Sequence, residues 1–337
     1  MTVKGKTPKK LKSTNYGKYG YYFILPFFIV YIVFSLWPLL STFYYSFFEY
    51  ITRNLKTTIT WAGLNNYLNI LGVGDEKAYF VKYLGNTLRI WAFNFLPQIL
   101  LALLIAAWLT DSRVRMKGGG LYKVMVYMPN IITAASISLL FYALLSKFGP
   151  IISTLKDWGW IASDADIMTS KWGTSLTLSF ILFWMWYGNS TLLLIAGMLG
   201  INPSLYEAAD IDGANGFNKF FRVTLPLLKP VLLYVFITSV IGGLQLYDIP
   251  ALFNTGTGGG LMGLPDDTST TVAMYIMRLH SSDTGRASAV SVLLFIITLI
   301  ISLVFFRVFR DSDDYKLAKK TRRIKNATAT SGKGGAQ

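Results

Sequence analysis

Long blocks of apolar residues constrain this chain more than any other feature of its sequence. A helix needs about 20 largely apolar residues to cross the hydrocarbon core of a bilayer. The chain has six such blocks, near residues 21–48, 84–109, 124–145, 176–199, 231–252 and 287–309. Backbone polar groups must be paired in lipid, and these blocks are too long, and alternate too little, to be barrel strands. The sequence therefore predicts an all-α membrane protein with six transmembrane helices.

The composition agrees with a membrane protein and excludes several kinds of site. Hydrophobic residues make up 53% of the chain and charged residues only 15%, whereas soluble domains carry about 25% charged residues. The absence of cysteine excludes disulfides and thiol-based catalysis or metal binding, and the single histidine, His280, leaves little room for a histidine-based site. The first apolar block is too long for the core of a signal peptide, so no cleaved leader is expected.

The basic residues predict how the chain lies across the membrane. The net charge of +15 is concentrated in residues 1–18, 113–123, 219–229 and 307–333. The alternate loops instead mix basic with acidic residues, in residues 49–83, 148–173 and 253–286. Lysine and arginine mark the cytoplasmic side, so both termini are expected inside. Topology and attraction to anionic membrane lipid explain this charge better than nucleic-acid binding does.

The chain reads as one membrane domain, residues 19–311, between two cytoplasmic basic tails, residues 1–18 and 312–337. The tails contain too few apolar residues to pack. No Walker-type, HExxH or GxSxG motif occurs, and the glycine-rich stretch 255–263 lacks the Lys and Ser/Thr that end a phosphate-binding loop. The chain is therefore expected to be a non-catalytic subunit with no cofactor of its own.

The loop of residues 200–230 has the best-defined pattern on the predicted cytoplasmic side. Asn202 or Ser204 can cap the start of a helix, with Pro203 suited to its first turn. Glu207 and two alanines suit the middle of this helix, and Gly213 can end it. Small residues allow such a helix to lie close in the groove of a partner. An ordinary interfacial helix packed on the bundle would show the same pattern, so both interpretations stay open at this point.

The motifs of this loop carry a resemblance to a known family. The triplets Glu207-Ala208-Ala209 and Asp212-Gly213-Ala214, followed by Leu225-Pro226, resemble the EAA loop of binding-protein-dependent ABC importer permeases. Similar elements of the sugar branch are Leu25-Pro26, Pro38, Ser46-Phe47, Gly63-Leu64-Asn65-Asn66-Tyr67, Asn86-Thr87, Met128-Pro129 and Gly149. The similarity covers about residues 20–310. Two departures lie outside the loop, at Gly258-Gly259-Gly260 and Ile152-Ser153.

The resemblance implies partners, a mechanism and a location. It implies a second permease subunit in a heterodimer, a cytoplasmic ATPase dimer that carries ATP and magnesium, and an extracytoplasmic sugar-binding protein. The EAA loop would dock a coupling helix into the ATPase, whose closure rocks the bundle from inward-open to outward-open. The expected coupling residues are Glu207, Ala208, Ala209, Asp212 and Gly213. The expected location is the plasma or inner membrane of a prokaryote.

Aromatic and amide residues within the spans are candidates for sugar contacts, because polar groups inside a membrane are costly and by default functional. The resemblance places the sugar between spans three, four and five, which gives the candidates Trp186, Tyr187, Asn189, Gly243, Gln245 and Asp248. Interfacial anchoring, packing and helix–helix hydrogen bonds are the alternatives. Those structural roles are the ones expected for Arg89, Asn94 and Gln98 in the second span.

Three other functions compete with a sugar importer permease. An ion-coupled secondary transporter would be expected to carry embedded carboxylates and internal repeats, whereas only Asp248 lies in a predicted span. An integral membrane enzyme would need a cluster of catalytic groups, and no acid pair or histidine site occurs in the spans. An ABC permease for a non-sugar solute fits the loop but not the aromatic fourth span.

Overall fold

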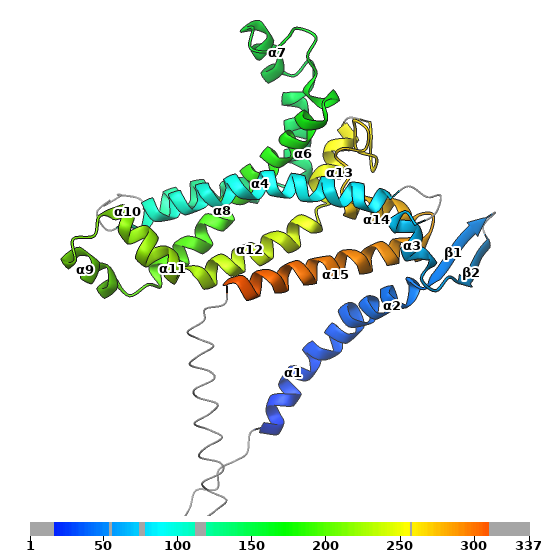
Figure 1. Cartoon of the computed structure of the whole chain (residues 1–337), viewed down its shortest axis with the longest axis horizontal. Coiled ribbons are helices and arrows are strands. Elements are labelled where there is room, and N and C mark those ends of the chain that lie inside the picture. Colours follow the sequence, from blue (N-terminus) through cyan, green and yellow to red (C-terminus); the bar gives the residue numbers. More distant parts are fainter. Residues whose placement is uncertain (1–16, 54–55, 74–77, 112–118, 257, 310–337) are drawn as a thin grey trace, which may run out of the picture.

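A bundle of four long helices forms the centre of the molecule (Figure 1). The computed structural model describes residues 17–53, 56–73, 78–111, 119–256 and 258–309, so the predicted tails lie almost wholly outside the described residues. The four helices are α4 (Tyr79–Thr110), α8 (Lys171–Leu199), α12 (Lys229–Leu244) and α15 (Thr284–Phe309). Helices α4 and α8 form the most extensive pair, and α12 packs against α4, α8 and α15.

The two ends of the bundle differ in structure. The end called here the hairpin end contains β1 (Phe48–Arg53), β2 (Lys56–Trp61), α3 (Asn65–Leu71) and α14 (Val272–His280). The strands pair antiparallel, with Phe48 opposite Trp61. The opposite end, called the loop end, contains α9 (Pro203–Ile211), α10 (Gly216–Lys219), the π-helical turn η4 (Phe220–Thr224) and α11 (Leu225–Leu227).

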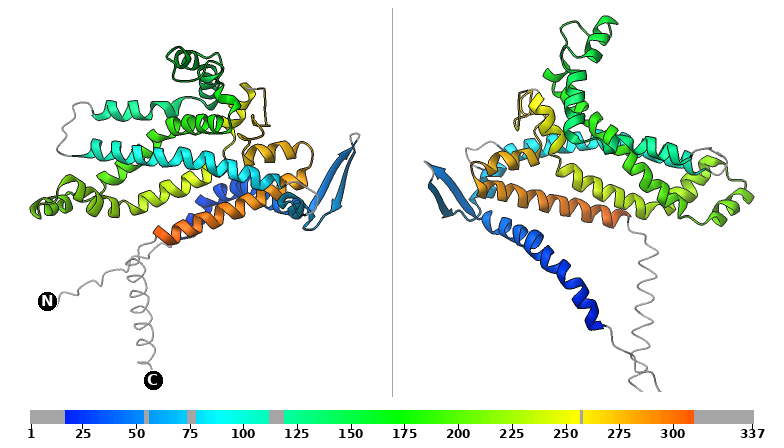
Figure 2. Two further views of the ribbon diagram at one scale, coloured as in Figure 1. Left: turned by 45° about the horizontal axis from the view of Figure 1, so that its top comes forward. Right: turned by 180° about the vertical axis from the view of Figure 1, so that it is seen from behind.

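A side arm leaves the direction of the bundle near its middle (Figures 1 and 2). It consists of α6 (Ala134–Leu145), which packs against α13 (Asp248–Gly256), with α7 (Pro150–Asp157) at its tip. Helix α5 (Gly119–Tyr127) and the 3₁₀ turn η2 (Met128–Ile131) lead into the arm along α8, and η3 (Ile167–Thr169) leads back to α8.

The first apolar segment diverges from the bundle along its N-terminal half (Figure 2). It runs through α1 (Gly17–Tyr31), η1 (Ile32–Leu36) and α2 (Trp37–Tyr45). Its most apolar stretch has no buried residue, although α2 packs on α15 through an edge-to-face contact of Phe43 with Phe295, ring centroids 5.8 Å apart. A helix with apolar side chains exposed on all sides suits a lipid environment.

Among the residues that the structure describes, five helices are long and apolar enough to cross a membrane, and a sixth counts only if a bent pair is one span. The five are Tyr19–Tyr45, Tyr79–Thr110, Ala134–Asp157, Lys171–Leu199 and Thr284–Val308; the pair is Gly216–Leu227 with Lys229–Leu244, bent by 67°. The sequence prediction of a mostly helical membrane protein is confirmed, and the described structure matches its count of six only with that pair.

Several predicted boundaries are wrong, and the all-α prediction missed the hairpin. The third block, residues 124–145, is not one helix: Pro129 lies in the 3₁₀ turn, and Thr133 starts α6 anew by accepting a hydrogen bond from the Ser136 N–H at 3.2 Å. The fifth block, residues 231–252, is interrupted between α12 and α13. The first helix ends at Tyr45, because the chain turns into the hairpin there.

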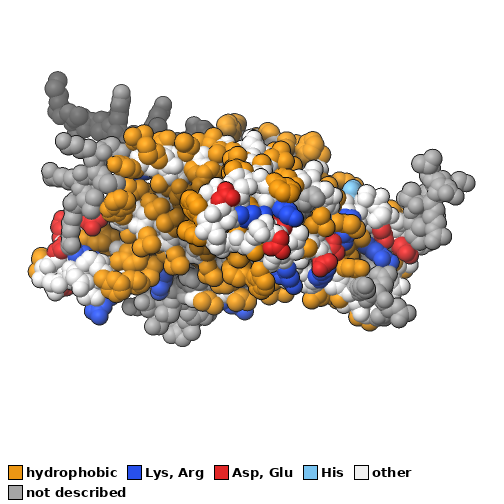
Figure 3. All heavy atoms as spheres, turned by 90° about the horizontal axis from the view of Figure 1, so that it is seen from above, with side chains coloured by type: hydrophobic (Ala, Val, Ile, Leu, Met, Phe, Trp, Pro, Cys, Tyr) orange, Lys and Arg blue, Asp and Glu red, His pale blue; other side chains and the backbone are white. Residues whose placement is uncertain are grey.

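The interior consists of three apolar clusters along the bundle. One lies at the hairpin end around Tyr83 and Val290, one at the arm around Ile181 and Phe253, and one at the loop end around Ala102 and Leu228. Figure 3 shows that apolar side chains also cover most of one outer face, while charged ones gather toward the ends and over the arm. Exposed apolar surface of this extent is typical of a face that contacts lipid or another protein.

Candidate functional site

A cavity of about 310 Å³ lies among α4, α8 and α12, beside the break between α12 and α13. Polar and aromatic residues in its wall are Trp91, Asn94 and Gln98 of α4, Trp186, Asn189 and Ser190 of α8, and Thr238 and Ser239 of α12. Gly242, Gly243, Gln245, Tyr247 and Asp248 also border it. Cavities of this size, apolar with a few convergent polar groups, are typical ligand sites.

The structure brings together most of the residues proposed from the sequence for sugar contact. Trp186, Asn189, Gly243, Gln245 and Asp248 all border this one cavity. Tyr187 does not: its ring lies beside Phe183, with ring centroids 6.0 Å apart. The sequence analysis did not propose the contributions of α4 or of Tyr247, although tryptophan and amides within a span are themselves a signal.

The two adjacent glycines of α12 differ in their surroundings. A Cβ on Gly242 would meet no atom within 4 Å, so this glycine leaves open space beside the cavity. A Cβ on Gly243 would overlap the indole ring of Trp91. The Trp91 indole N–H donates to Ser239 Oγ at 3.0 Å, and the ring stacks on Phe95, so the absence of a side chain at Gly243 lets α4 and α12 approach.

The two buried amides of α4 also differ. Gln98 Nε2 donates to Ser190 Oγ at 2.7 Å and ties α4 to α8, which is the structural role expected for it. Asn94 is only 8% exposed, and its Oδ1 has no hydrogen-bond partner in the described structure. An unsatisfied buried oxygen is unusual and needs an explanation.

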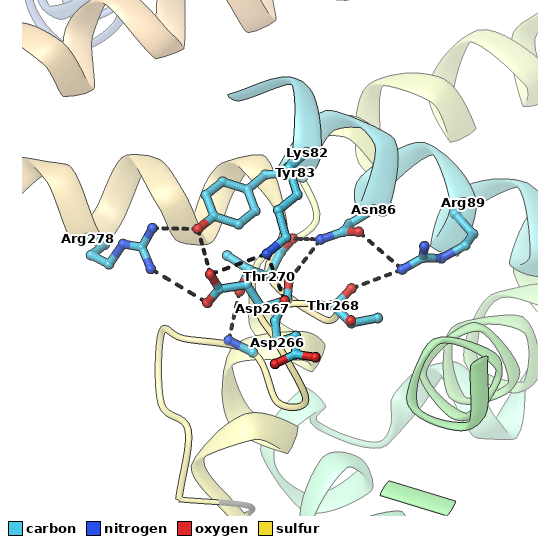
Figure 4. Close-up of polar contacts among 10 residues, drawn as sticks. Lys82, Tyr83, Asn86, Arg89, Asp266, Asp267, Thr268, Thr270 and Arg278 are labelled. Atoms are coloured by element: carbon cyan, nitrogen blue, oxygen red, sulfur yellow. Dashed lines mark hydrogen bonds and ion pairs between the residues drawn. The ribbon is translucent and has the colours of Figure 1, made fainter. Parts of the chain in front are cut away.

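A polar cluster at the hairpin end fixes the loop that follows α13 (Figure 4). The Asp267 carboxylate accepts a hydrogen bond from Tyr83 OH at 3.1 Å and lies 3.7 Å from Lys82 Nζ and 4.0 Å from Arg278 Nη1. Asn86 Nδ2 donates to the Asp267 carbonyl at 2.8 Å. These contacts join α4, α14 and the loop into one unit.

The same unit holds the broken end of α12 in place. Thr271 Oγ1 donates to the Leu246 carbonyl at 2.6 Å, within the break that borders the cavity. The N–H of Val272 donates to Thr87 Oγ1 at 3.0 Å. Asn86 and Thr87, which form one of the sequence motifs, therefore anchor this loop on α4.

The loop end presents a short helix to its surroundings. Asn202 Oδ1 accepts a hydrogen bond from the Ser204 N–H at 3.1 Å and caps α9, so Asn202 is the cap of the two residues predicted for that role. Glu207 and Ala208 are exposed on α9, whereas Ala209 is buried. Asp212 follows the helix, and Gly213 ends the turn with a φ of 73°, a conformation that favours glycine.

Two polar contacts join α9 to the following turn. The buried Lys219 of α10 forms an ion pair with Asp210 of α9. Tyr206 OH and Thr224 Oγ1 lie 3.0 Å apart and share a hydrogen bond. These four residues, called the α9 brace, attach the short helix to α10 and η4, from which the chain continues through α11 into α12.

Metal coordination is not a feature of the part of the chain that the structure describes. No group of three or more His, Asp or Glu side chains lies close enough there to hold an ion. The described residues instead form a cavity whose walls contain aromatic and hydrogen-bonding side chains, which suits it to bind a ligand. The protruding helix α9 is connected to α12, which forms one of those walls.

The sequence matches the family described as binding-protein-dependent transport system inner membrane component, over residues 90–312. The lactose transport system permease protein LacF of Rhizobium radiobacter is 28% identical over 90% of this chain and 97% of LacF. The trehalose/maltose transport system permease protein MalF of Thermococcus litoralis is 31% identical over 89% of this chain and 96% of MalF. A crystal structure of a bacterial ABC transporter that imports alginate matches with a TM-score of 0.67 at 21% identity, over 89% of this chain and 97% of that one. The chain therefore belongs to the family of inner membrane components of binding-protein-dependent transport systems.

Proposed function

We propose that this chain is a membrane-spanning subunit of an ATP-driven importer that moves a sugar or oligosaccharide into the cytoplasm. The observation that carries the proposal is the connection made by α12. At one end this helix follows the segment that holds the protruding α9, and along its length Thr238, Ser239 and Gly242 border the cavity. A push on α9 would therefore move a wall of the cavity.

Membership of this family supports a proposal of three partners. A cytoplasmic ATPase dimer, which binds ATP and magnesium, would receive α9, and a second permease subunit would complete a heterodimer. An extracytoplasmic binding protein would deliver the sugar to the hairpin end. This orientation uses the positive-inside rule and counts the bent pair as the sixth span, with the EAA loop and both termini in the cytoplasm.

The proposal assigns roles to residues at both sites. Glu207 and Ala208 contact the ATPase, Ala209 packs the helix on its own loop, and Asp212 and Gly213 shape the turn behind it. In the cavity Trp186, Asn189, Gln245 and Asp248 contact the sugar. Gly243 acts indirectly by allowing Trp91 into the wall. The named substrates of the relatives, lactose and trehalose or maltose, support a sugar as the solute.

Reconstitution tests the proposal directly. The chain, its second permease and the ATPase are placed in proteoliposomes with the binding protein, and uptake of labelled sugar is followed. Uptake is expected to require the binding protein, and ATP on the side of the membrane that carries the ATPase. It is expected to continue in the presence of an uncoupler that dissipates ion gradients. Uptake that an uncoupler abolishes and that proceeds without ATP would instead identify an ion-coupled secondary transporter.

A further inference from the structure

One side of α4, turned away from the cavity, is apolar and exposed along most of the helix. Its large side chains recur every three or four residues and are 43–69% exposed: Phe93, Leu96, Leu100, Leu104 and Trp108. This spacing places them on one side of the helix. The five residues, called here the α4 stripe, form an apolar surface that requires a cover other than water.

The α4 stripe has the length of a membrane. Arg89 lies on the same side of the helix as the stripe, and from Arg89 to Trp108 an α-helix rises by about 28 Å. The hydrocarbon core of a bilayer is about 30 Å thick. Tryptophan and basic residues mark the two membrane–water interfaces, and here they bound the stripe at its ends.

The residue types of the stripe favour lipid over a second helix as its cover. Helices that pack against each other in a membrane use small residues at the contact. The packed side of α4 follows this rule, because Ala102 and Ala106 are fully buried in the cluster at the loop end. The stripe instead consists of Leu, Phe and Trp, the residues that suit contact with acyl chains.

Arg89 is held in a fixed place at the hairpin end of the stripe. Its guanidinium carbon lies over the Trp172 ring of α8, 5.6 Å from the ring centroid, and that ring meets Phe93 edge to face at 6.0 Å. Nη2 donates to Asn86 Oδ1 and to the Thr268 carbonyl, both at 3.1 Å (Figure 4). The cation is therefore presented next to an exposed indole, since Trp172 is 55% exposed.

These contacts do not neutralise the charge of Arg89. Both of its acceptors are uncharged oxygens, and it forms no ion pair with a carboxylate of the described residues. Of its nitrogens without a partner there, Nε is fully buried and Nη1 is not. Lys171, exposed and adjacent to Trp172 in sequence, adds a second positive charge at this end. Cations at a membrane surface attract anionic lipid, and a guanidinium donates strongly to phosphate oxygens.

We propose that the α4 stripe faces lipid and that Arg89, supported by Trp172, binds the phosphate of an anionic phospholipid at the hairpin end. Arg89 Nη1 donates to a phosphate oxygen, and the acyl chains lie along Phe93 and Leu96. The proposal requires only that α4 crosses the membrane, as its length and hydropathy support. It does not depend on the solute that the importer moves.

The absence of cysteine allows a fluorescent probe to be placed on the stripe. A bimane group on Leu96→Cys lies about 10 Å along the helix from Arg89, at the depth of the middle of an acyl chain. The complex with the second permease and the ATPase, both freed of cysteine, is reconstituted in mixtures of phosphatidylglycerol and phosphatidylcholine. One of the two lipids carries bromine in its acyl chains. Bromine quenches the bimane on contact, so the two quenching curves give the relative affinity of the lipids at this position.

Phosphatidylglycerol is expected to bind at least threefold more strongly than phosphatidylcholine beside Leu96→Cys. Arg89→Gln should reduce this ratio to about one, whereas Arg89→Lys, which keeps the charge, should hold it at two or more. A matched probe on Leu104→Cys lies on the same stripe about 22 Å from Arg89. There the ratio should be the same with Arg89 and with Gln in its place. Unaltered elution of the complex verifies that each variant assembles.

Two results with the probe on Leu96→Cys overturn the proposal. A ratio of one with Arg89 in place would mean that no headgroup is selected. The lack of quenching by either lipid would mean that a protein chain covers the stripe. An equal fall of the ratio at Leu104→Cys on replacing Arg89 would likewise overturn it, because the charge would then act on all surrounding lipid and not at a site.

A water-soluble headgroup distinguishes a lipid from a free phosphodiester. Glycerophosphoglycerol, which lacks acyl chains, is expected to leave the ratio at Leu96→Cys unchanged. If it abolishes the preference, the site binds the free phosphodiester and the lipid assignment is wrong. None of these measurements involves transport, so failure of ATP-driven uptake would contradict the proposed function and leave the lipid site standing.

Discussion

Adjacent glycines of α12 provide a test of packing at the level of single residues. Gly243→Ala would drive its Cβ into Trp91 and is expected to destabilise the protein by about 1–3 kcal/mol, as overpacking does. Gly242→Ala meets open space and, as a helical Gly→Ala change, is expected to stabilise it by up to about 1 kcal/mol. Thermal unfolding in detergent measures the stability of both variants. If the unfolding temperature shifts equally and in the same direction in the two variants, the packing assigned to these glycines is wrong.

Gly213 tests backbone conformation in the turn behind α9. Its φ of 73° is left-handed, and a residue with a Cβ pays roughly 1–2 kcal/mol there. We expect Gly213→Val to lower ATP-driven uptake at least tenfold while the subunit still inserts. Gly213→Asn should retain most activity, because asparagine tolerates this conformation better than other side chains do. Loss of uptake in both variants alike would show that something other than φ matters at this position.

Some residues could be predicted from the sequence because their task is local or recurrent. Asn66 belongs to the motif Gly63-Leu64-Asn65-Asn66-Tyr67. In the structure its Nδ2 donates to the carbonyls of Ser46 and Phe48, both at 2.9 Å. Asn202, one of the two residues predicted to cap its helix, does so in the structure. The lack of a partner for Asn94 Oδ1 among the described residues could not be predicted, because whether a buried amide is satisfied depends on the helix that lies opposite it.

At the scale of elements, the α9 brace is the contact most open to test. Lys219 is largely buried, so removing its partner leaves a poorly solvated charge, at a cost on the order of 1–2 kcal/mol between the surface and fully buried limits. Asp210→Asn or Lys219→Met should loosen α9 from α10. We expect ATP hydrolysis to persist while sugar uptake falls at least fivefold, a loss of coupling rather than of assembly.

A charge reversal separates a specific pair from general sensitivity of the loop. Asp210→Lys combined with Lys219→Asp is expected to recover at least half of the lost uptake, because the ion pair is restored with opposite polarity. Arg222→Gln removes one charge from the same segment at an exposed position and should leave uptake near normal. If the double variant takes up no more sugar than either single variant, the ion pair of Asp210 and Lys219 is not what couples α9 to transport.

The positions of helices could be predicted from the sequence where hydropathy alone determines them. The long helices α4, α8 and α15 match blocks two, four and six to within a few residues, because lipid requires continuous apolar helices. The hairpin was missed because its strands are short and partly polar, although Thr and Ile in residues 57–60 favour strand. The breaks after α5 and α12 were missed because long apolar stretches lie on both sides of them. Pro129 with Asn130 in one break, and Gln245 with Asp248 at the other, were the signals of an interruption.

The whole molecule has two ends that differ in chemistry and structure, and the absence of cysteine offers a clean way to assign their sides. Trp61 at the hairpin end and Phe217 at the loop end are 69% and 70% exposed, so cysteine at either position would be similarly accessible to a reagent. The positive-inside rule places the loop end in the cytoplasm.

In intact cells, a membrane-impermeant maleimide is therefore expected to label Trp61→Cys and not Phe217→Cys. After the membrane is made permeable, both should react to a similar extent, which controls for reactivity. ATP is made inside the cell, so an ATPase can reach α9 only if Phe217→Cys is protected in intact cells. Labelling of Phe217→Cys from outside would place α9 on the wrong side of the membrane, and no rearrangement within the bundle could then couple it to ATP.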